Sequence, residues 1–215
     1  MSEKTAGAAS ERLEPEDQAR ADFYALLARL FRESPDAALL RAIAAAPPLA
    51  PSPSAEGNDD MGVALAAAWN ALRSASATVD VDTAREEYQT LFVGVGRSEV
   101  SLYASHYVGP QSGRPLAEIR ATLADLGLAR RPAESEFEDH LALVLETMRM
   151  LVAGDIERPP AEISEQRRFF DRHVMPWASK CCTAIEDSSV ANYYRHVAQF
   201  SRCFVGIEEA SFAIA

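Results

Sequence analysis

The sequence contains few cysteines, and their spacing suits neither a redox motif nor a metal site. Cys181, Cys182 and Cys203 are its three cysteines, and they form no CxxC pair. An odd and sparse set of this kind gives no disulfide framework and is typical of reduced thiols in a cytosolic protein. We therefore expect structural thiols that play no part in chemistry.

Long apolar runs are also missing. The longest uncharged apolar stretches, residues 61–72 and 42–55, are shorter than a bilayer requires, and the second contains four prolines. The chain begins MSEKTAGAASERLEPED, which lacks the apolar segment of a secretory signal. We expect a cytoplasmic protein without a transmembrane helix, in which residues 1–14 form a disordered tail.

Positive charge is scarce relative to negative charge. The 21 Lys and Arg residues are outnumbered by 32 Asp and Glu residues, which leaves a net charge of −11. This charge repels phosphate backbones and anionic membrane surfaces, and it speeds the encounter with a basic peptide. Because 48% of the residues are hydrophobic, the chain can also bury one sizeable core.

The common catalytic motifs do not occur in this sequence. HExxH, GxSxG and the GxxxxGK[ST] phosphate loop are all missing. The residues three positions before the four histidines are not glutamates, so the pairs that build carboxylate-bridged metal sites in helical bundles are absent too. The pair of glycines at 94 and 96 lacks the third glycine of a dinucleotide fingerprint and indicates a helix-ending turn. We expect no enzyme activity and no metal ion.

The spacing of apolar residues predicts helices and no sustained strand; the β-like fragments at 91–95 and 100–108 are short. Residues 47–60 are expected to form a flexible surface loop and residues 94–114 a long ordered loop. The predicted fold is all-α, a single bundle of roughly eight to ten helices over residues 15–215. In the first half of the chain, the expected helices are 15–32, 36–46, one from Met61, one capped by Asp82, and 115–126. The next is opened by a capping box at 135–138, which places Phe137 on its apolar face. A further helix starts at Pro159 or Pro160, carries Ile163, Phe169, Phe170 and Val174, and is limited by Pro176; aromatic-rich segments follow from Trp177 and from 190 to 212.

The segment EYQTLFVG, residues 87–94, presents two rings and a leucine at helical spacing. Tyr88, Leu91 and Phe92 can line a groove for a ligand, and ordinary core packing explains the same spacing equally well. The segment LYASHY, residues 102–107, places tyrosines around a serine on the long loop. Such rings suit the wall of a peptide site, or they pin the loop to the core.

The tripeptide Glu138-Asp139-His140 lies in an acidic cluster with Glu134 and Glu136. Acidic residues are favoured at a helix N-terminus by capping and by the helix dipole, so a purely structural role is the simpler interpretation. A histidine here can nonetheless hydrogen-bond to a bound peptide, and it titrates near neutral pH.

In chain order, the patterns EYxxLFxG, YxSxY, EDHLALxLExM and QxxFFxxHxxPW, followed by a late tyrosine pair and an aromatic tail, resemble the TorD/DmsD/NarJ superfamily of redox-enzyme maturation chaperones. The similarity covers about residues 23–204. It implies an all-helical protein that binds the twin-arginine signal peptide or N-terminal segment of a molybdenum-cofactor oxidoreductase subunit and delays its export until the cofactor is inserted. The resemblance implies no resident cofactor, only transient contact with the molybdopterin cofactor or a nucleotide.

The resemblance also implies which residues contact the peptide. The matching positions are the aromatic-x-x-Leu-Phe residues of the first pattern, the first tyrosine and the serine of the loop pattern, and the Glu-Asp-His tripeptide. No catalytic residue is implied. The predicted peptide-binding residues are Tyr88, Leu91, Phe92, Tyr103, Ser105, Glu138, Asp139 and His140.

The chain departs from the family pattern at Leu102 and Phe137, where proline is usual, so the loop and the helix entry can differ in shape. Two other functions stay open at this point. The chain can be a helical scaffold that binds a mature folded subunit, or a nucleotide- or cofactor-dependent maturation factor. The sequence names no client enzyme, and it does not distinguish a monomer from a homodimer.

Overall fold

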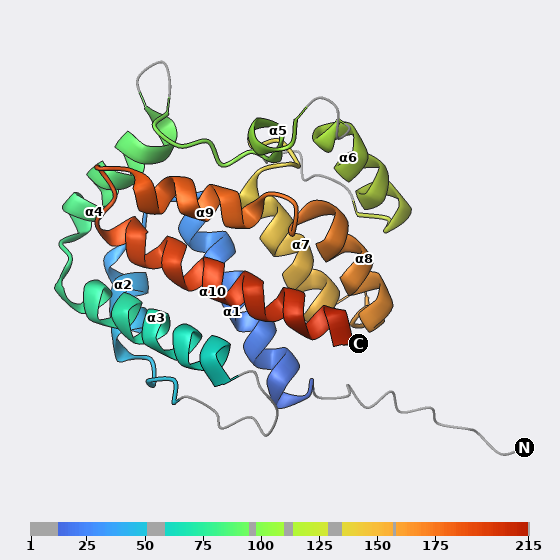
Figure 1. Ribbon diagram of the computed structural model, residues 1–215, viewed down its shortest axis with the longest axis horizontal. Coiled ribbons are helices and arrows are strands. Elements are labelled where there is room, and N and C mark those ends of the chain that lie inside the picture. The colour runs from blue at the N-terminus through green and yellow to red at the C-terminus, as the bar shows by residue number, and fades with distance from the viewer. Residues whose placement is uncertain are drawn as a thin grey trace, which may run out of the picture.

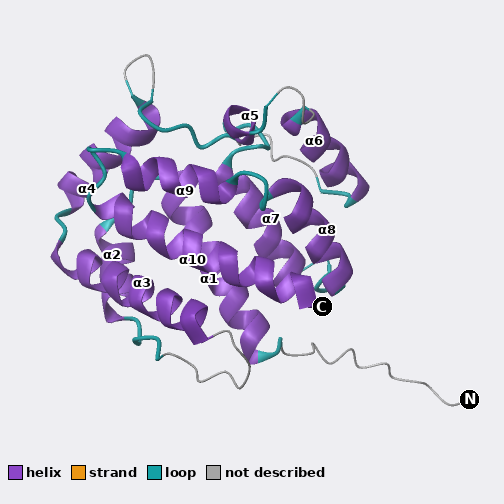
Figure 2. Ribbon diagram, in the orientation of Figure 1, coloured by secondary structure: helices purple, strands orange, loops and turns teal. Residues whose placement is uncertain are grey.

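The computed structural model describes residues 13–50, 59–94, 98–109, 114–128, 135–156 and 158–214. Within these ranges the chain forms ten α-helices and a π-helical turn, with no strand (Figure 2). The predicted all-α class is therefore confirmed. None of the described helices combines the length and the apolar character that a membrane span requires. The expected tail and most of the expected loop at 47–60 lie outside the described residues.

The helices follow one another along the chain, and α5 lies in the segment between η1 and α6. Their bounds are α1 Pro15–Arg32, α2 Ala37–Ala45, α3 Asp59–Thr78, α4 Val81–Tyr88, η1 Gln89–Val93, α5 Ala104–Tyr107, α6 Pro115–Asp125, α7 Leu141–Ala153, α8 Ile163–His173, α9 Ala178–Asp187 and α10 Tyr193–Ile214.

The longest helix, α10, organises the bundle. It packs between α3 and α9, and α1 packs along α7 behind it (Figure 1). Helix α2 lies against α3, and α8 lies against both α6 and α7. The N-terminal end of α7 is thus near α5, whereas its C-terminal end is near the start of α8 (Figure 1).

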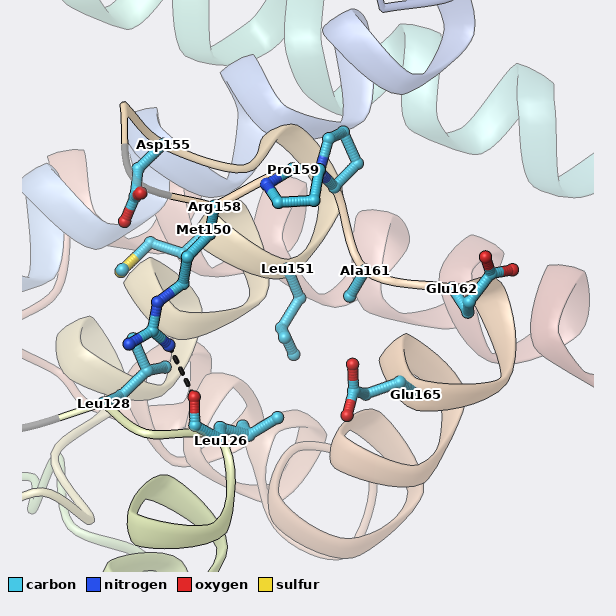
Figure 3. Close-up of a pocket in the computed structure, with 11 residues that line it drawn as sticks. Leu126, Leu128, Met150, Leu151, Asp155, Arg158, Pro159, Ala161, Glu162 and Glu165 are labelled. Atoms are coloured by element: carbon cyan, nitrogen blue, oxygen red, sulfur yellow. Dashed lines mark hydrogen bonds between the residues drawn. The ribbon is translucent and has the colours of Figure 1, made fainter.

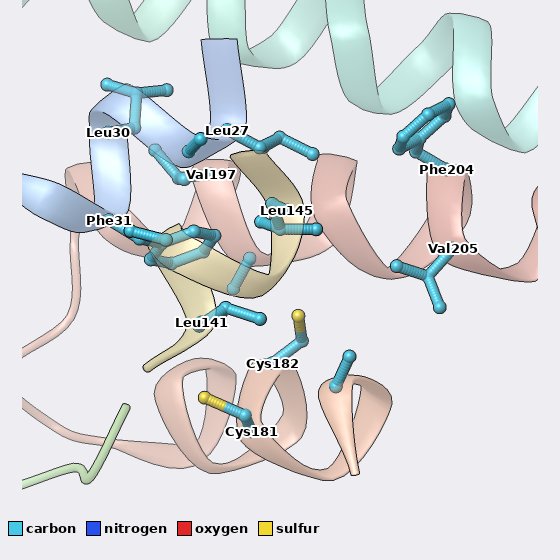
Figure 4. Packing of buried hydrophobic residues seen from close by; sticks show 14 of the residues in the cluster. Leu27, Leu30, Phe31, Leu141, Leu145, Cys181, Cys182, Val197, Phe204 and Val205 are labelled. Atoms are coloured by element: carbon cyan, nitrogen blue, oxygen red, sulfur yellow. The ribbon is translucent and has the colours of Figure 1, made fainter. Parts of the chain in front are cut away.

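The core lies where α1, α7, α9 and α10 meet. Figure 4 shows Phe31, Leu145, Cys182 and Val205 packed together, one from each of these helices, and all four are buried. Burying an aliphatic or aromatic side chain stabilises the fold by about 1.5–3 kcal/mol. Burial also raises the pKa of the Cys182 thiol to about 12, so this thiol stays protonated and unreactive.

The predicted start of α4 is wrong by two residues. Asp80, and not Asp82, is the N-cap, because its carboxylate accepts hydrogen bonds from the backbone N–H groups of Asp82 and Thr83 at 2.9 and 3.3 Å. Asp82 lies inside the first turn and pairs with Arg85. Both aspartates suit a helix start, and the local pattern does not distinguish them.

The predicted capping box at 135–138 is also wrong. Helix α7 begins at Leu141, and His140 is its N-cap, with Nδ1 accepting the N–H of Ala142 at 3.2 Å. The glutamate of the expected box, Glu138, instead accepts a hydrogen bond from Arg120 of α6 at 2.9 Å. Phe137 therefore lies outside the helix and is 51% exposed.

One further boundary differs from the prediction. Helix α8 begins at Ile163, after the two prolines, and Ile163 is exposed. The segment after α2 is described as far as residue 50, and there its backbone carbonyls contact α3. Trp69 Nε1 donates to the carbonyl of Pro47 at 2.9 Å, and Asn70 Nδ2 donates to that of Leu49 at 3.3 Å.

A buried polar network joins α1 to α10. The carboxylate of Glu208 on α10 is fully buried and accepts hydrogen bonds from Arg20 Nε and Nη2 of α1 at 2.8 and 2.9 Å. It also accepts the Tyr24 hydroxyl at 2.8 Å. The Arg20 guanidinium lies over the Phe212 ring at 5.4 Å. A charge at this depth is tolerated because both carboxylate oxygens are paired.

Replacing Glu208 with alanine should therefore destabilise the protein by about 3–5 kcal/mol, because the Arg20 charge and the Tyr24 hydroxyl lose their buried acceptor. Urea unfolding followed by circular dichroism measures this change. The neighbouring Glu209 is exposed, so Glu209→Ala is the matched control and should change the unfolding free energy by less than about 0.5 kcal/mol. Equal effects of the two substitutions would contradict the network.

Candidate functional site

The first predicted segment ends α4 with a π-helical turn, a feature often found at functional sites. The Tyr88 hydroxyl donates to the backbone carbonyl of Arg32, at the C-terminal end of α1, at 2.7 Å. The Phe92 ring lies 5.3 Å from the Tyr88 ring and 5.0 Å from the Tyr194 ring. Leu91 is fully buried. Tyr88 and Leu91 are thus buried, and the Phe92 ring of this motif is partly exposed.

A residue of the same segment that the sequence analysis did not select, Glu87, is buried and fixes α4 to α10. Its carboxylate accepts the backbone N–H groups of Asn192, Tyr193 and Tyr194 at 2.8, 2.9 and 2.8 Å. It therefore satisfies free donors at the N-terminus of α10. The sequence contains one indication that Glu87 is buried. Glu87 follows Ala84 by three positions, which places a charged residue on the buried face of the helix.

The loop motif and the Glu-Asp-His tripeptide lie against each other. The N–H of Ala104 donates to the carbonyl of Asp139 at 2.9 Å, and the N–H of Leu141 donates to the carbonyl of Leu102 at 2.8 Å. Tyr103 and His140 form an isolated antiparallel bridge between these segments. A short β-like contact thus exists here without a strand, and it holds the loop on the N-terminus of α7.

The side chain of Asp139 completes this connection. One of its carboxylate oxygens accepts both the hydroxyl of Ser105, at 2.7 Å, and the N–H of the same residue, at 3.1 Å. Asp139 is buried, whereas Ser105 is exposed. Because the serine hydroxyl already donates to the aspartate, the pair fixes the loop and presents little unused hydrogen-bonding capacity to a ligand.

Tyr103 is the centre of the exposed part of the site. Its hydroxyl donates to the carboxylate of Glu136, and its ring lies 4.9 Å from the His140 ring and 6.5 Å from the Phe137 ring. Burial and the neighbouring Glu136 raise the pKa of Tyr103 above its ordinary value. The hydroxyl therefore remains a donor at neutral pH.

The same carboxylate links the two motifs. Burial raises the pKa of Tyr88 to about 12, and the charge of Glu136 contributes to the increase. The Glu136 charge therefore acts on both tyrosines, and its carboxylate is hydrogen-bonded to Tyr103. We call the surface formed by Tyr88, Phe92, Tyr103, Glu136 and Phe137 the aromatic site.

The geometry of the aromatic site suits binding better than catalysis. The Nδ1 atom of His140 accepts the N–H of Ala142, so this nitrogen is not available as a general base. Glu138 is paired with Arg120 and is largely covered. Within the described part of the chain, His, Cys, Asp and Glu side chains nowhere gather in threes in a way that can hold a metal ion. Exposed rings beside a carboxylate can bind a segment that is both apolar and basic.

A small hollow of about 160 Å³ lies next to Asp139, between α5, α6 and the end of α8. His173 borders this hollow, and its Nε2 lies 2.8 Å from Thr122 Oγ1. Burial lowers the pKa of His173 from 6.5 to about 4, and the adjacent Arg172 acts in the same direction. The ring is therefore neutral at physiological pH.

The lowered pKa of His173 predicts a pH dependence of stability. The unfolded chain takes up a proton at this residue near pH 6.5, whereas the folded chain does so only near pH 4. The contribution of His173 should be complete above pH 6.5 and should be lost as the pH falls toward 4, by on the order of 3 kcal/mol. The difference in unfolding free energy between wild type and His173→Asn, measured from pH 7.5 to 4.5, should shrink on acidification. A constant difference would contradict the buried neutral ring.

Comparison with known proteins identifies the family. The model of the nitrate reductase delta subunit family matches residues 58–183, which include α3 to α8 and every residue of the aromatic site. An uncharacterised protein of Haemophilus influenzae is 29% identical over 132 residues, which are 61% of this chain and 63% of that protein. The chaperone protein TorD of Salmonella bongori is 28% identical over 108 residues, which are 50% of this chain and 48% of the relative.

The alignments thus span less than two thirds of each of these curated relatives, whereas the family model covers more than half of this chain. The matched region contains the loop and tripeptide motifs that the structure brings together at the aromatic site. The chain therefore belongs to the nitrate reductase delta subunit family, within the TorD/DmsD/NarJ superfamily of redox-enzyme maturation chaperones.

Proposed function

We propose that this protein is a cytoplasmic, non-enzymatic chaperone for a molybdenum-cofactor oxidoreductase. It binds the twin-arginine signal peptide or N-terminal segment of the catalytic subunit at the aromatic site and delays export until the cofactor is inserted. The observation that carries the proposal is the contact of the loop motif with the tripeptide segment, which places the partly exposed Tyr103 ring beside the Glu136 carboxylate and the exposed Phe137 ring. The TorD relative supports the same class of function.

Apolar contact supplies most of the expected affinity. Burying one large apolar side chain of the peptide gives roughly 1.5–3 kcal/mol, whereas an exposed pair between an arginine and a carboxylate gives about 0–1 kcal/mol. Micromolar affinity corresponds to about 8 kcal/mol, which a few buried anchors can supply after the cost of ordering the peptide. Phe92 and Phe137 therefore retain the peptide, and the acidic surface speeds its arrival.

The predicted peptide-binding residues divide into three groups in this proposal. Phe92 and Tyr103 are partly exposed and offer rings to the ligand. Tyr88, Leu91, Asp139 and His140 are buried and act through the shape of the site. Ser105 and Glu138 are paired with Asp139 and Arg120 and hold the segments in place. Phe137, which replaces the proline usual in the family, adds an exposed ring beside Tyr103 and gives this chain its own peptide preference.

Removing the exposed ring tests this assignment with little risk to the fold. Phe137→Ser should weaken binding of a twin-arginine signal peptide by about tenfold, mainly through faster dissociation, because one apolar anchor is lost. Calorimetry and stopped-flow fluorescence measure affinity and dissociation rate. The matched control is Val63→Ser on α3, because Val63 is 50% exposed and lies outside the aromatic site.

A Lys-Lys version of the peptide serves as the second control. Unchanged affinity in Phe137→Ser would count against the aromatic site. Binding of a mature folded subunit without any dependence on its arginine pair would favour the scaffold function. Tight nucleotide binding that is lost in His140→Ala would favour a nucleotide-dependent maturation factor.

A further inference from the structure

A second hollow lies at the opposite end of α7 from the aromatic site. It has a volume of about 420 Å³, within the usual range for ligand pockets, and it lies between the end of α6, the end of α7 and the start of α8. Figure 3 shows Leu126 and Leu151 on its apolar floor, with Ala161 lining the α8 side. Ile156 and Ile163, each next to a lining residue in the sequence, are exposed. We call this hollow the α7–α8 groove.

Backbone contacts hold the end of α7 against the segment that precedes α8. Gly154 ends α7 with φ +69°, and a Cβ atom at this position would lie 2.5 Å from the backbone oxygen of Arg158, so only glycine fits. The N–H of Asp155 donates to the carbonyl of Arg158 at 2.8 Å, and the N–H of Ala161 donates to the carbonyl of Leu151 at 2.8 Å. These contacts position both sides of the groove.

The charges around the groove are mostly negative. Asp155, Glu162 and Glu165 line it. Among the described lining residues Arg158 is the one cationic side chain, and its guanidinium donates to the backbone carbonyls of Leu126 and Gly127 (Figure 3). Glu165 also lies 3.8 Å from Arg168, a solvent-exposed pair that water screens. The groove therefore complements a ligand that is apolar and positively charged.

We propose that the α7–α8 groove is a second peptide-binding site, which accepts an extended client segment whose bulky apolar side chains alternate with lysine or arginine. Apolar side chains of the segment enter the hollow against Leu126 and Leu151, and its basic side chains face Glu162 and Glu165. Helix α7 has 13 residues and separates this groove from the aromatic site by about 20 Å. The inference goes beyond the proposed function because it requires no twin-arginine pair.

The test uses the full chain and a fluorescein-labelled decapeptide of alternating leucine and lysine, followed by fluorescence anisotropy at two salt concentrations. Alternating Leu-Glu and Ser-Lys peptides are the ligand controls. Ala161→Trp fills the hollow and should weaken binding by at least about tenfold. The double substitution Glu162→Gln with Glu165→Gln should weaken binding by about threefold and reduce its salt dependence. Circular dichroism verifies that each variant is folded.

Two control variants test whether a loss of peptide binding is specific to the α7–α8 groove. Asp187→Asn with Glu209→Gln removes two exposed charges outside the groove and should leave binding unchanged. Phe92→Ala weakens the aromatic site, which can also bind apolar and basic segments, so binding that persists in this variant and is lost in Ala161→Trp is assigned to the groove. Failure of the proposed function and failure of this inference can then be distinguished.

Several results would overturn the inference. These are no binding by the wild-type chain, equal binding of the Leu-Glu peptide, or unchanged affinity in the double glutamine variant together with Ala161→Trp. If Phe92→Ala alone abolishes binding, the peptide binds at the aromatic site and not in the groove. A concentration-dependent dimer that Ala161→Trp abolishes would instead assign the groove to a second copy of the chain.

Discussion

The buried carboxylate of Asp139 connects two segments that the proposed site requires in contact. It binds both the N–H and the hydroxyl of Ser105, 34 residues away, while its own backbone carbonyl accepts the N–H of Ala104. A carboxylate removed from water must keep such partners, because an unpaired buried charge costs several kcal/mol. This requirement fixes the loop on the N-terminus of α7 and so places Tyr103 beside Glu136 and Phe137.

Glu87 has the corresponding role on the other half of the site. By accepting three N–H groups at the start of α10, it fixes the end of α4 against that helix and sets Tyr88 and Phe92 beside Tyr194. Glu87 and Asp139 thus hold their segments together from inside the fold, while Phe92 and Tyr103 remain partly exposed. Because buried carboxylates hold the backbone of these segments in place, aromatic side chains can stay exposed instead of packing into the core.

Much of this arrangement was predictable, and the failures have physical causes. The apolar period of α1 gave its correct boundaries, since helical spacing is a local property. The start of α7 was mispredicted because Glu138 pairs with Arg120, a partner 18 residues away that no local capping pattern reveals. The buried position of Glu87 and the exposure of Phe137 likewise depend on tertiary contacts. The motif order identified the family, but it did not separate the buried residues of the site from the exposed ones.

The proposed function depends on peptide binding at the aromatic site, so the most direct test is to locate a bound signal peptide. Hydrogen–deuterium exchange with a saturating twin-arginine peptide should slow backbone exchange in residues 88–94, 102–107 and 135–140 together, because these segments border one surface. Protection in all three segments is the result that the account predicts. Protection confined to other helices, or no protection despite demonstrated binding, would contradict it.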